Sequence, residues 1–365
     1  MNKRKIGASL LIGIWIMLVL MVWFLPNKQV SVAERRPLAK RPNMSFEDLW
    51  DRSYMENFEK YGLDQFPLRD SFRKVKSLFH YYGLGQKDNN NIYIYKGHGA
   101  KMEYPLNYSS VDFALRKFQY IYDNYLEGKK NNIIMAMVPD KSYYMAEASN
   151  HLSVDYVKLN EYVNEKIRWA THVDLSNQLT LDDYYRTDTH WKQENLFKPA
   201  NKLAEALKVS SPDRNDYQKE KITRPFYGVF YGQAALPMKA DNITLMESDF
   251  LKKCSVFDYE KNEYTEIYNR EKIDGKDMYE VYLSGAKALL EIENPSGKKN
   301  RELIIFRDSF ASSIAPLLME DYSKIIMVDI RYISSKMIGE FIDFKNQDVL
   351  FLYNSLIFNN SSVLK

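Results

Sequence analysis

Three side chains in this sequence have the types and spacing needed for nucleophilic catalysis. Asp188 and His190 lie two residues apart in YYRTDTHW, residues 184–191, and Ser309 follows in RDSF, residues 307–310. A serine hydroxyl becomes a good nucleophile when an imidazole accepts its proton, and a carboxylate can fix the tautomer of that imidazole and stabilise its charged form. In an extended turn, side chains two residues apart point to one side. The three residues are therefore candidates for nucleophile, base and orienting carboxylate.

Each part of this set also has a simpler interpretation. Asp188 and His190 could belong to a polar surface loop or to a metal pair, and His172 with Asp174 forms a second mixed pair nearby. No histidine spacing typical of zinc sites supports the metal interpretation, so no metal site is predicted. Ser309 is also a good helix N-cap residue, and capping alone would explain it.

The surroundings of Ser309 strengthen the catalytic interpretation. The residue follows the apolar run Ile304–Phe306 and precedes an expected amphipathic helix over FASSIAPLLMEDY, residues 310–322. A hydroxyl at such a strand-to-helix turn is exposed at the edge of a sheet. The backbone N–H groups at the start of the helix would suit a developing oxyanion.

The second half of the chain alternates between apolar runs and helical patterns, and this rhythm predicts an α/β fold with a parallel sheet. In such sheets ligands bind outside the carboxyl ends of the strands. This rule draws attention to four segments that follow apolar runs: 139–141, 307–309, 329–332 and 353–355, which include Lys141, Ser309, Arg331 and Tyr332. The strands are expected within residues 131–142, 172–175, 302–309, 324–330 and 348–355. The helices are expected over Ser110–Glu127, Val154–Ala170, Trp191–Leu207, 310–322 and 335–344.

Two other regions differ from this pattern. Residues 45–85 have a helical pattern that begins with Ser45 as an N-cap candidate and is broken at Pro67. Residues 213–300 are rich in Tyr, Phe, Val and Gly, and we expect a β-rich insertion there. Within it, Tyr227, Gly228, Tyr231 and Gly232 are strand and turn candidates, or could line a groove.

The N-terminus carries a long apolar segment, residues 6–25, directly after the cations Lys3, Arg4 and Lys5. A helix of that length spans about 30 Å, the thickness of the hydrocarbon core of a bilayer. A cleavable signal peptide usually has a shorter apolar core of about 7–15 residues. We therefore expect an uncleaved membrane anchor, with a signal peptide or a buried core helix as alternatives.

No later segment is apolar enough to return through the membrane, so the bulk of the chain is expected outside the cytoplasm of a single-pass cell-membrane protein. The cations before the segment favour an N-terminus inside, although more basic residues follow it. The expected division is an anchor over 1–27, a linker over 28–45, and an α/β domain over 46–365 that includes the β-rich insertion.

Composition excludes some classes of function. The 51 Lys and Arg nearly balance the 48 Asp and Glu, and this net charge of +3 gives no nucleic-acid signature. A hydrophobic content of 45% is enough for a sizeable core. The single cysteine, Cys254, rules out an intramolecular disulfide framework and a cysteine-based zinc site.

The segment YYRTDTHW resembles the signature of the DHHW family, in which Asp-x-His-Trp is preceded by Tyr-Arg-Thr. These proteins are similar to the alginate O-acetyltransferase group, which has an SGNH-hydrolase-like domain with permuted segment order, so that Asp-x-His precedes the serine. The resemblance extends over about residues 30–360. It includes Glu34, Arg36 and Leu38, then FEKYGLDQFPLRD at 58–70, RDSF, and Asp329, Arg331 and Tyr332.

This resemblance implies polysaccharide O-acyl transfer, with Ser309 as nucleophile, His190 as base and Asp188 as orienting carboxylate. It implies no cofactor, a polysaccharide acceptor, and a multi-pass membrane-bound O-acyltransferase as acyl donor. The chain departs from the pattern at Thr189, where the family has a second His, and at Arg307, where SGNH enzymes usually have Gly. The arginine could tighten the turn, or its cation could hold an acyl donor.

Five residues are expected to contact the substrate or the oxyanion: Arg331, Tyr332, Trp191, Arg307 and Phe310. Alternatively, Arg331 pairs with Asp329, Tyr332 is a rim residue, and Trp191 opens the next helix. Two other functions remain open at this point: an O-acetylesterase with the same triad, or a non-catalytic glycan-binding or scaffold component of the cell envelope.

Overall fold

The computed structural model describes residues 3–44, 46–50 and 52–365, so the N-cap expected at Ser45 lies outside the described residues. The chain forms two compact units. Their residues are Met1–Asn90 with Tyr231–Pro237 in the first, and Asn91–Phe230 with Met238–Lys365 in the second. This division differs from the expected boundaries at residues 27 and 45, which stay a prediction.

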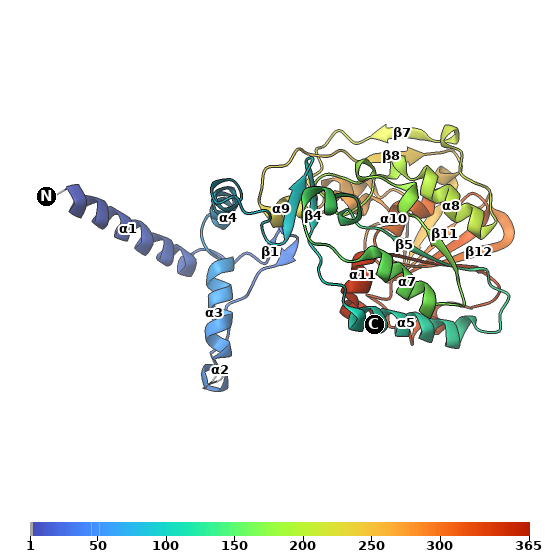
Figure 1. Cartoon of the computed structure of the whole chain (residues 1–365), viewed down its shortest axis with the longest axis horizontal. Helices are drawn as coiled ribbons and strands as arrows, with labels where there is room; N and C mark the ends of the chain where they lie inside the picture. Colours follow the sequence, from blue (N-terminus) through green and yellow to red (C-terminus); the bar gives the residue numbers. More distant parts are fainter. Residues whose placement is uncertain (1–2, 45, 51) are drawn as a thin grey trace. The chain divides into compact units, whose positions relative to one another are not determined.

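The second unit is built on one eight-stranded sheet with the order β10-β9-β11-β13-β12-β14-β5-β6 (Figure 1). The five strands from β13 to β6 are parallel to one another, and β11, β9 and β10 extend the sheet in antiparallel pairing. The strands are β5 (Ile133–Val138), β6 (Thr171–Asp174), β9 (Ser255–Asp258), β10 (Glu263–Thr265), β11 (Leu289–Glu293), β12 (Lys298–Arg307), β13 (Tyr322–Val328) and β14 (Asp348–Asn354).

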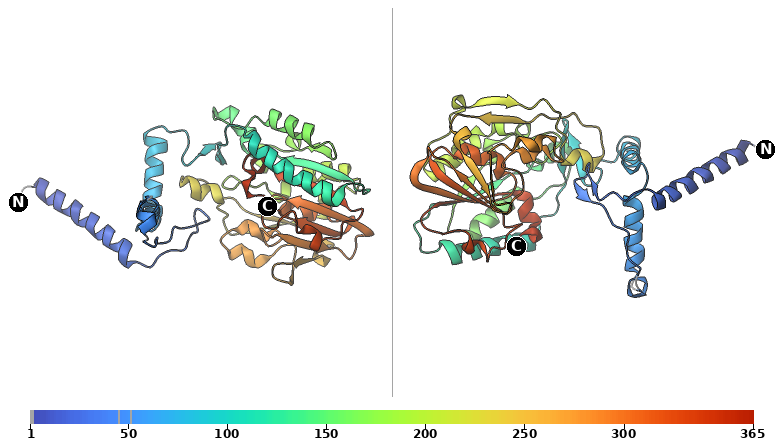
Figure 2. Two further views of the ribbon diagram at one scale, coloured as in Figure 1. Left: turned by 90° about the horizontal axis from the view of Figure 1, so that it is seen from below. Right: turned by 180° about the vertical axis from the view of Figure 1, so that it is seen from behind.

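Alternation of apolar side chains explains why both faces of this sheet are covered. Along β12, Leu303 and Ile305 join one buried cluster, whereas Ile304 and Phe306 join another. Helices α8 and α10 contribute to the first cluster, and α5, α7 and α11 to the second, which gives three layers (Figure 2). These helices are α5 (Tyr108–Ile121), α7 (Tyr156–Lys166), α8 (Phe197–Leu207), α10 (Ala311–Ile314) and α11 (Ser355–Asn359). The predicted α/β fold class, with a parallel sheet flanked by helices, is confirmed.

The segment expected to be β-rich, residues 213–300, supplies β9, β10 and β11 to this sheet. It also forms a separate antiparallel pair, β7 (Gln218–Lys221) with β8 (Thr244–Glu247). One stretch within it is helical instead, namely α9 (Val229–Ala234). The remaining helices and strands named for the second unit are the hairpin β3 (Ile92–Tyr95) with β4 (His98–Lys101), and the short helix α6 (Ser142–Met145).

Three helix predictions were wrong in extent, and one of these is the helix expected over Trp191–Leu207, which begins as α8 only at Phe197. The expected amphipathic helix after Ser309 is only the four residues of α10 followed by a tight turn at Ala315–Leu318, all buried, because Pro316 cannot continue an α-helix. The helix expected over 335–344 is a single turn at Ile338–Glu340. There, Tyr125 donates to the carbonyl of Ser335, and the N–H of Ser335 donates to the last residue, Lys365.

The first unit begins with α1 (Lys3–Phe24), and Lys5–Phe24 is the one helix in the described part of the chain that is long and apolar enough to cross a membrane. The segment that follows pairs β1 (Val30–Ser31) with β2 (Arg36–Pro37). Arg36 forms a two-pronged ion pair with Asp64, at 2.8 Å and 2.6 Å. The further helices are α2 (Phe46–Trp50), α3 (Ser53–Asp64) and α4 (Arg69–Leu78).

Candidate functional site

Asp188, His190 and Ser309 form one chain of hydrogen bonds in the second unit. The Nδ1 atom of His190 lies 2.6 Å from Oδ1 of Asp188, and its Nε2 atom lies 2.7 Å from Oγ of Ser309. Ser309 follows the carboxyl end of β12, and the His190 loop precedes α8 on the same face of the sheet. The three residues that the sequence singled out are therefore brought together, although 119 residues separate His190 from Ser309.

The carboxylate of Asp188 fixes the tautomer of His190. An ionised carboxylate can only accept hydrogen bonds, so the proton of the neutral imidazole lies on Nδ1, and Nε2 is left to accept from Ser309. Asp188 is fully buried. Its Oδ1 also accepts the backbone N–H of His190 at 3.1 Å, and its Oδ2 accepts that of Val229 at 2.9 Å. These bonds hold the carboxylate in place.

The imidazole ring of His190 lies between two aromatic side chains. Tyr279 stacks on it with ring centroids 3.8 Å apart and an interplanar angle of 8°. Phe310 packs at 4.9 Å in a tilted arrangement. Because both rings are buried, His190 is held in one orientation, with only 7% of its surface exposed. The phenol of Tyr279 donates to or accepts from Ser313 at 2.8 Å, and burial raises its pKa well above the usual range.

Trp191 joins the histidine loop to the serine turn. Its indole N–H is shared between the carbonyl of Phe310 at 3.1 Å and Oγ of Ser313 at 2.9 Å. The next residue but one, Gln193, donates to the carbonyl of Ser313 at 2.9 Å. Trp191 is fully buried, and α8 begins only at Phe197, so it neither opens that helix nor presents a surface to substrate.

The turn that carries Ser309 is shaped by the side chain of Asp308. Its Oδ1 accepts the N–H of Phe310 at 2.9 Å, and its Oδ2 accepts that of Asn354, at the end of β14, at 2.6 Å. The N–H of Asp308 itself donates to Leu352 at 3.4 Å. Among the backbone N–H groups of residues 308–310, only that of Ser309 makes no hydrogen bond within the described chain. The N–H of Phe310, where an oxyanion contact was expected, is already occupied by Asp308, and that of Ser309 is not.

Arg307 lies beneath this turn and is fully buried. Its Nη1 donates to Oγ of Ser312 at 2.8 Å, and Nη2 reaches the carbonyls of Gly285 at 3.4 Å and Lys287 at 3.5 Å. Of the two expected roles, the geometry matches tightening of the turn. A cation enclosed in this way is not placed to hold an acyl donor.

Arg331 and Tyr332 follow the carboxyl end of β13 but are not equivalent. Arg331 forms a two-pronged ion pair with the buried carboxylate of Asp329, at 2.8 Å and 2.6 Å, which is the alternative interpretation of this residue. Tyr332 is 48% exposed and lies on the surface. Of the two, Tyr332 is the side chain that is open to a ligand.

A second layer of contacts holds the segment before Asp188. The carboxylate of Asp241 accepts the N–H groups of Arg186 and Thr187 at 2.9 Å and 2.8 Å, and the Thr187 hydroxyl at 2.6 Å. The ammonium of Lys141 donates to the carbonyl of Tyr185 at 2.9 Å. Lys141 is buried, and this burial lowers its pKa to about 7. The loop is thus tied to two other parts of the unit.

Gly228 makes room for the carboxylate. A Cβ atom built on Gly228 would lie 2.2 Å from Cβ of Asp188, closer than any real contact. Its N–H donates to the Thr187 hydroxyl at 2.9 Å. The close approach of backbone to Asp188 is what requires glycine here. Tyr227, the residue before it, has an exposed side chain. Neither residue lies in a strand, and Gly228 contacts Asp188 directly.

The second mixed pair, His172 and Asp174, is engaged locally. Nε2 of His172 donates to the carbonyl of Ile167 at 2.6 Å, and Oδ1 of Asp174 accepts the N–H of Ser176 at 2.8 Å. Both lie on or beside the edge strand β6 rather than at the triad.

The sequence assigned no role to Tyr279 or Asp241, and it marked Lys141 only by its place after a strand. Tyr279 is one of 28 tyrosines, and nothing in its neighbourhood marks it as the ring that stacks on His190. Lys141 had one signal, because it follows the carboxyl end of a predicted strand, where ligand sites gather. Asp241 had none, since its role depends on a loop that only the folded chain brings to Thr187.

No family model matches the chain, and no curated protein sequence matches it either. Solved structures do. A DHHW family protein from Eubacterium siraeum superposes with a TM-score of 0.60 at 19% identity, covering 76% of this chain and 95% of that one. The likeness is one of fold. The predicted resemblance to a DHHW family protein is confirmed at that level.

Two further solved structures are similar. PatB1 from Bacillus cereus, determined with a sulfonyl adduct, gives a TM-score of 0.57 at 15% identity and covers 73% of this chain and 95% of its own. The O-acetyltransferase domain of AlgJ from Pseudomonas putida gives a TM-score of 0.42 at 13% identity, covering 69% of this chain and 84% of its own.

Proposed function

We propose that this protein is an O-acyltransferase that carries an acetyl group on Ser309 and passes it to a hydroxyl of a polysaccharide. The observation that supports this most directly is the unbroken hydrogen-bond chain from Asp188 through His190 to Ser309, at 2.6 Å and 2.7 Å. That arrangement is the one in which a serine hydroxyl can lose its proton as it attacks a carbonyl.

In the first half of the reaction, Oγ of Ser309 attacks the carbonyl carbon of the donor ester. Its proton moves to Nε2 of His190, and Asp188 stabilises the imidazolium that results. The bond from the carbonyl carbon to the donor's leaving group then breaks, and His190 returns the proton to that group. The product is an ester between the acetyl group and Ser309.

In the second half, a sugar hydroxyl attacks the acyl-serine. His190 accepts the proton of that hydroxyl and gives it to Oγ of Ser309 as the ester bond to the enzyme breaks. In each half the oxyanion develops next to the N–H of Ser309, the donor of this turn that is not used by the fold. A hydrolase would differ only in that water takes the place of the sugar.

The N-terminal helix supports a place at the cell membrane. Lys5–Phe24 has the length and apolarity of a single membrane span, and we assign the bulk of the chain to the extracytoplasmic side. A multi-pass membrane-bound O-acyltransferase would supply the acyl group there, and the anchor would raise the local concentration of Ser309 near that donor.

The test uses the full-length protein in detergent with p-nitrophenyl acetate as donor, with and without an added oligosaccharide. Mass spectrometry of the sugar measures transfer, and acetate release measures hydrolysis. Acetylated sugar that disappears in the Ser309→Ala variant supports the proposal. Acetate release without transfer would assign the same residues to an esterase, and turnover that is unchanged in Ser309→Ala would contradict both.

A further inference from the structure

One helix of the first unit exposes its apolar face. From Leu68, the residue that caps α4, through α4 and the helical turn that continues it over Phe79–Gly83, five apolar side chains recur every three or four residues. Those within the helix therefore lie in one stripe. These side chains keep half or more of their surface exposed: Leu68 69%, Phe72 50%, Val75 65%, Phe79 58% and Tyr82 63%.

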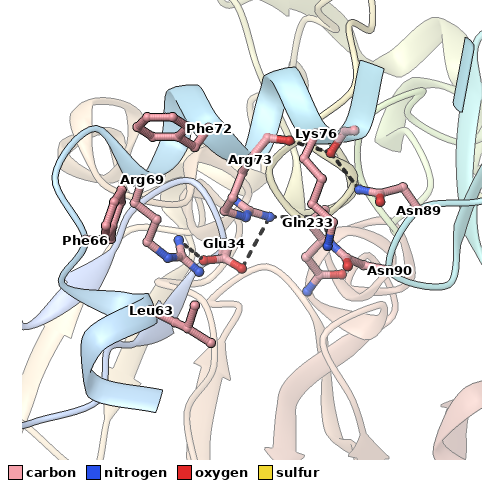
Figure 3. A pocket seen from close by; sticks show the side chains of 11 residues that line it. Glu34, Leu63, Phe66, Arg69, Phe72, Arg73, Lys76, Asn89, Asn90 and Gln233 are labelled. Atoms are coloured by element: carbon pink, nitrogen blue, oxygen red, sulfur yellow. Dashed lines mark hydrogen bonds and ion pairs between the residues drawn. The ribbon is translucent and has the colours of Figure 1, made fainter. Parts of the chain in front are cut away.

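The opposite, charged face of α4 is the one that packs. Arg69 pairs with Glu34 at 2.6 Å, and Arg73 pairs with Glu34 at 3.3 Å and donates to the carbonyl of Gly232 at 3.0 Å. Figure 3 shows both arginines extending toward Glu34, whereas Phe72 does not. Ser77, on the same face, is 2% exposed.

A helix on the surface of a water-soluble domain has the reverse arrangement, with apolar residues inside and charges outside. An exposed apolar stripe of this length costs free energy in water, and the arginines that anchor α4 prevent it from turning over. The stripe is therefore built to meet a surface other than water.

The charges beside the stripe identify that surface. Lys74 and Lys76 are exposed and flank Val75 of the stripe in the sequence. Figure 3 shows the Lys76 side chain on the Arg73 side of α4, extending toward Asn90. The one acid of the helix, Asp70, pairs with Arg69 and Arg73. Lysines in this position can extend to anionic headgroups while their stems cover apolar surface. Aromatic side chains such as Phe72 and Tyr82 are favoured at the same depth.

The start of α4 is also tied to the end of the apolar helix α1. The side chain of Gln65 exchanges hydrogen bonds with the backbone of Lys28, at 2.9 Å and 3.0 Å. Tyr61 donates to the side chain of Asn27 at 2.9 Å. Gln65 lies three residues before Leu68, so the stripe begins close to the point at which the chain leaves α1.

We propose that the stripe of α4, from Leu68 to Tyr82, lies in the headgroup region of an anionic lipid bilayer, with Lys74 and Lys76 on its phosphates. The first unit would then be held at the membrane surface by α4 as well as by α1. This inference rests on α1 crossing the membrane, as proposed above, and goes beyond it.

The test places an environment-sensitive fluorophore on the full chain, reconstituted in vesicles of phosphatidylglycerol and phosphatidylcholine. The fluorophore is attached to a cysteine introduced by Val75→Cys in the stripe or by Asp70→Cys on the other side. Both variants carry Cys254→Ala, which removes the natural buried thiol so that only the introduced cysteine is labelled. Lipids spin-labelled near the headgroup report contact. We expect the Val75→Cys probe to be quenched several-fold more strongly than the Asp70→Cys probe.

Equal quenching at the two positions, or a Val75→Cys probe that aqueous iodide reaches freely, would overturn the inference. Carbonate extraction separates its failure from that of the anchor: a chain that stays in the pellet retains α1 in the bilayer whatever α4 does. Release of the chain by carbonate would contradict both the membrane anchor and this inference. The stripe would instead bind a protein if the Val75→Cys probe is exposed to water in vesicles and the same position cross-links to a protein in native membranes. That pair of results would contradict the lipid assignment.

The lysines provide a second readout. The Lys74→Glu, Lys76→Glu double variant should lower quenching of the Val75→Cys probe in anionic vesicles toward the level found in pure phosphatidylcholine. The control is Lys60→Glu with Lys87→Glu, which makes the same change of charge at exposed positions off α4. An equal loss of quenching in both double variants would show that only the net charge of the protein matters. It would contradict the proposed contact between the lysines of α4 and the lipid headgroups.

Discussion

Trp191 donates its indole N–H to the backbone carbonyl of Phe310, with 3.1 Å between Nε1 and the oxygen. The residue after His190 thus holds the residue after Ser309, across 119 residues of sequence. This bond, and the one to Ser313, link the loop of His190 to the turn of Ser309 through a fully buried side chain. We therefore expect the tryptophan of the YYRTDTHW segment to act as a positioning residue.

The Trp191→Phe variant tests this role, because it keeps an aromatic ring and removes only the N–H donor. We expect the rate of serine acylation to fall about tenfold or more, since small displacements of reacting groups are costly. Stability should fall by about 1 kcal/mol for the lost hydrogen bonds. Rates of p-nitrophenyl acetate turnover and thermal unfolding give the two numbers.

The matched control is Trp169→Phe. The indole N–H of Trp169 donates to Gln119 at 2.8 Å, and its ring packs in the cluster on the other face of the sheet. It should lose comparable stability and keep its rate. Equal losses of rate in the two variants would show that Trp191 acts only through overall stability.

Gly228→Ala should disable the site without touching a reacting group. The new Cβ would lie 2.2 Å from Cβ of Asp188, so one of the two backbones must move, and the carboxylate would lose its place beside His190. We expect turnover to fall about 100-fold. Gly62→Ala is the control, because nothing lies within 4 Å of its added Cβ, and it should keep full activity. A Gly228→Ala enzyme of normal rate would contradict the packing described here.

Asp188→Asn removes the charge and keeps the shape of the side chain. The amide can donate to Nδ1 of His190, which favours the tautomer that cannot accept the proton of Ser309. The expected loss of turnover is about 10⁴-fold, as in other serine–histidine–aspartate sites. Asp213→Asn, at an exposed turn, should have no effect, because asparagine caps such turns equally well. A loss smaller than tenfold in Asp188→Asn would mean that Asp188 does not orient the base.

His98 should make the second unit sensitive to acid. Burial, aided by the cations Lys141, Lys192 and Arg186, lowers its pKa to about 4 from an ordinary value near 6.5. Between these values the unfolded chain binds a proton that the folded chain does not, so stability is retained above pH 6.5 and falls as the pH drops toward 4. Thermal unfolding should show this loss.

The comparison that isolates His98 is the difference between the parent and His98→Gln in unfolding temperature at pH 7.5 and pH 5. The parent should lose a few degrees more than the variant on acidification, because glutamine does not titrate in this range. Identical shifts in the two proteins would assign the acid sensitivity to other groups.

The fold and the three central residues could be predicted because local signals agreed. Apolar runs such as Ile133–Val138 become buried parallel strands, and the residues after them gather at one edge, as the topology of parallel sheets requires. Asp188 and His190 two apart already implied a shared direction. Whether His190 comes close to Ser309 depends on the order of the strands in the sheet. The alternation of strands and helices along the sequence defines that order only in part.

The contacts that refine the site could not be read from the sequence, for a physical reason. Arg307 was open to two roles until the fold showed it enclosed by Gly285, Lys287 and Ser312. The N–H of Phe310 is taken by Asp308, which depends on a turn geometry that the sequence permits but does not require. The exposed stripe of α4 was likewise hidden, since an amphipathic pattern does not say which of its faces is packed.

The measurement that tests the central claim most directly is covalent labelling of the full-length protein with phenylmethanesulfonyl fluoride. An activated serine displaces fluoride and gains the sulfonyl group, and peptide mass spectrometry locates it. We predict one adduct, on Ser309, absent in Ser309→Ala and formed at least about 100-fold more slowly in His190→Ala, because the base is lost. Labelling that persists at the same rate in Ser309→Ala, or at another residue, would contradict the assignment of Ser309 as the nucleophile.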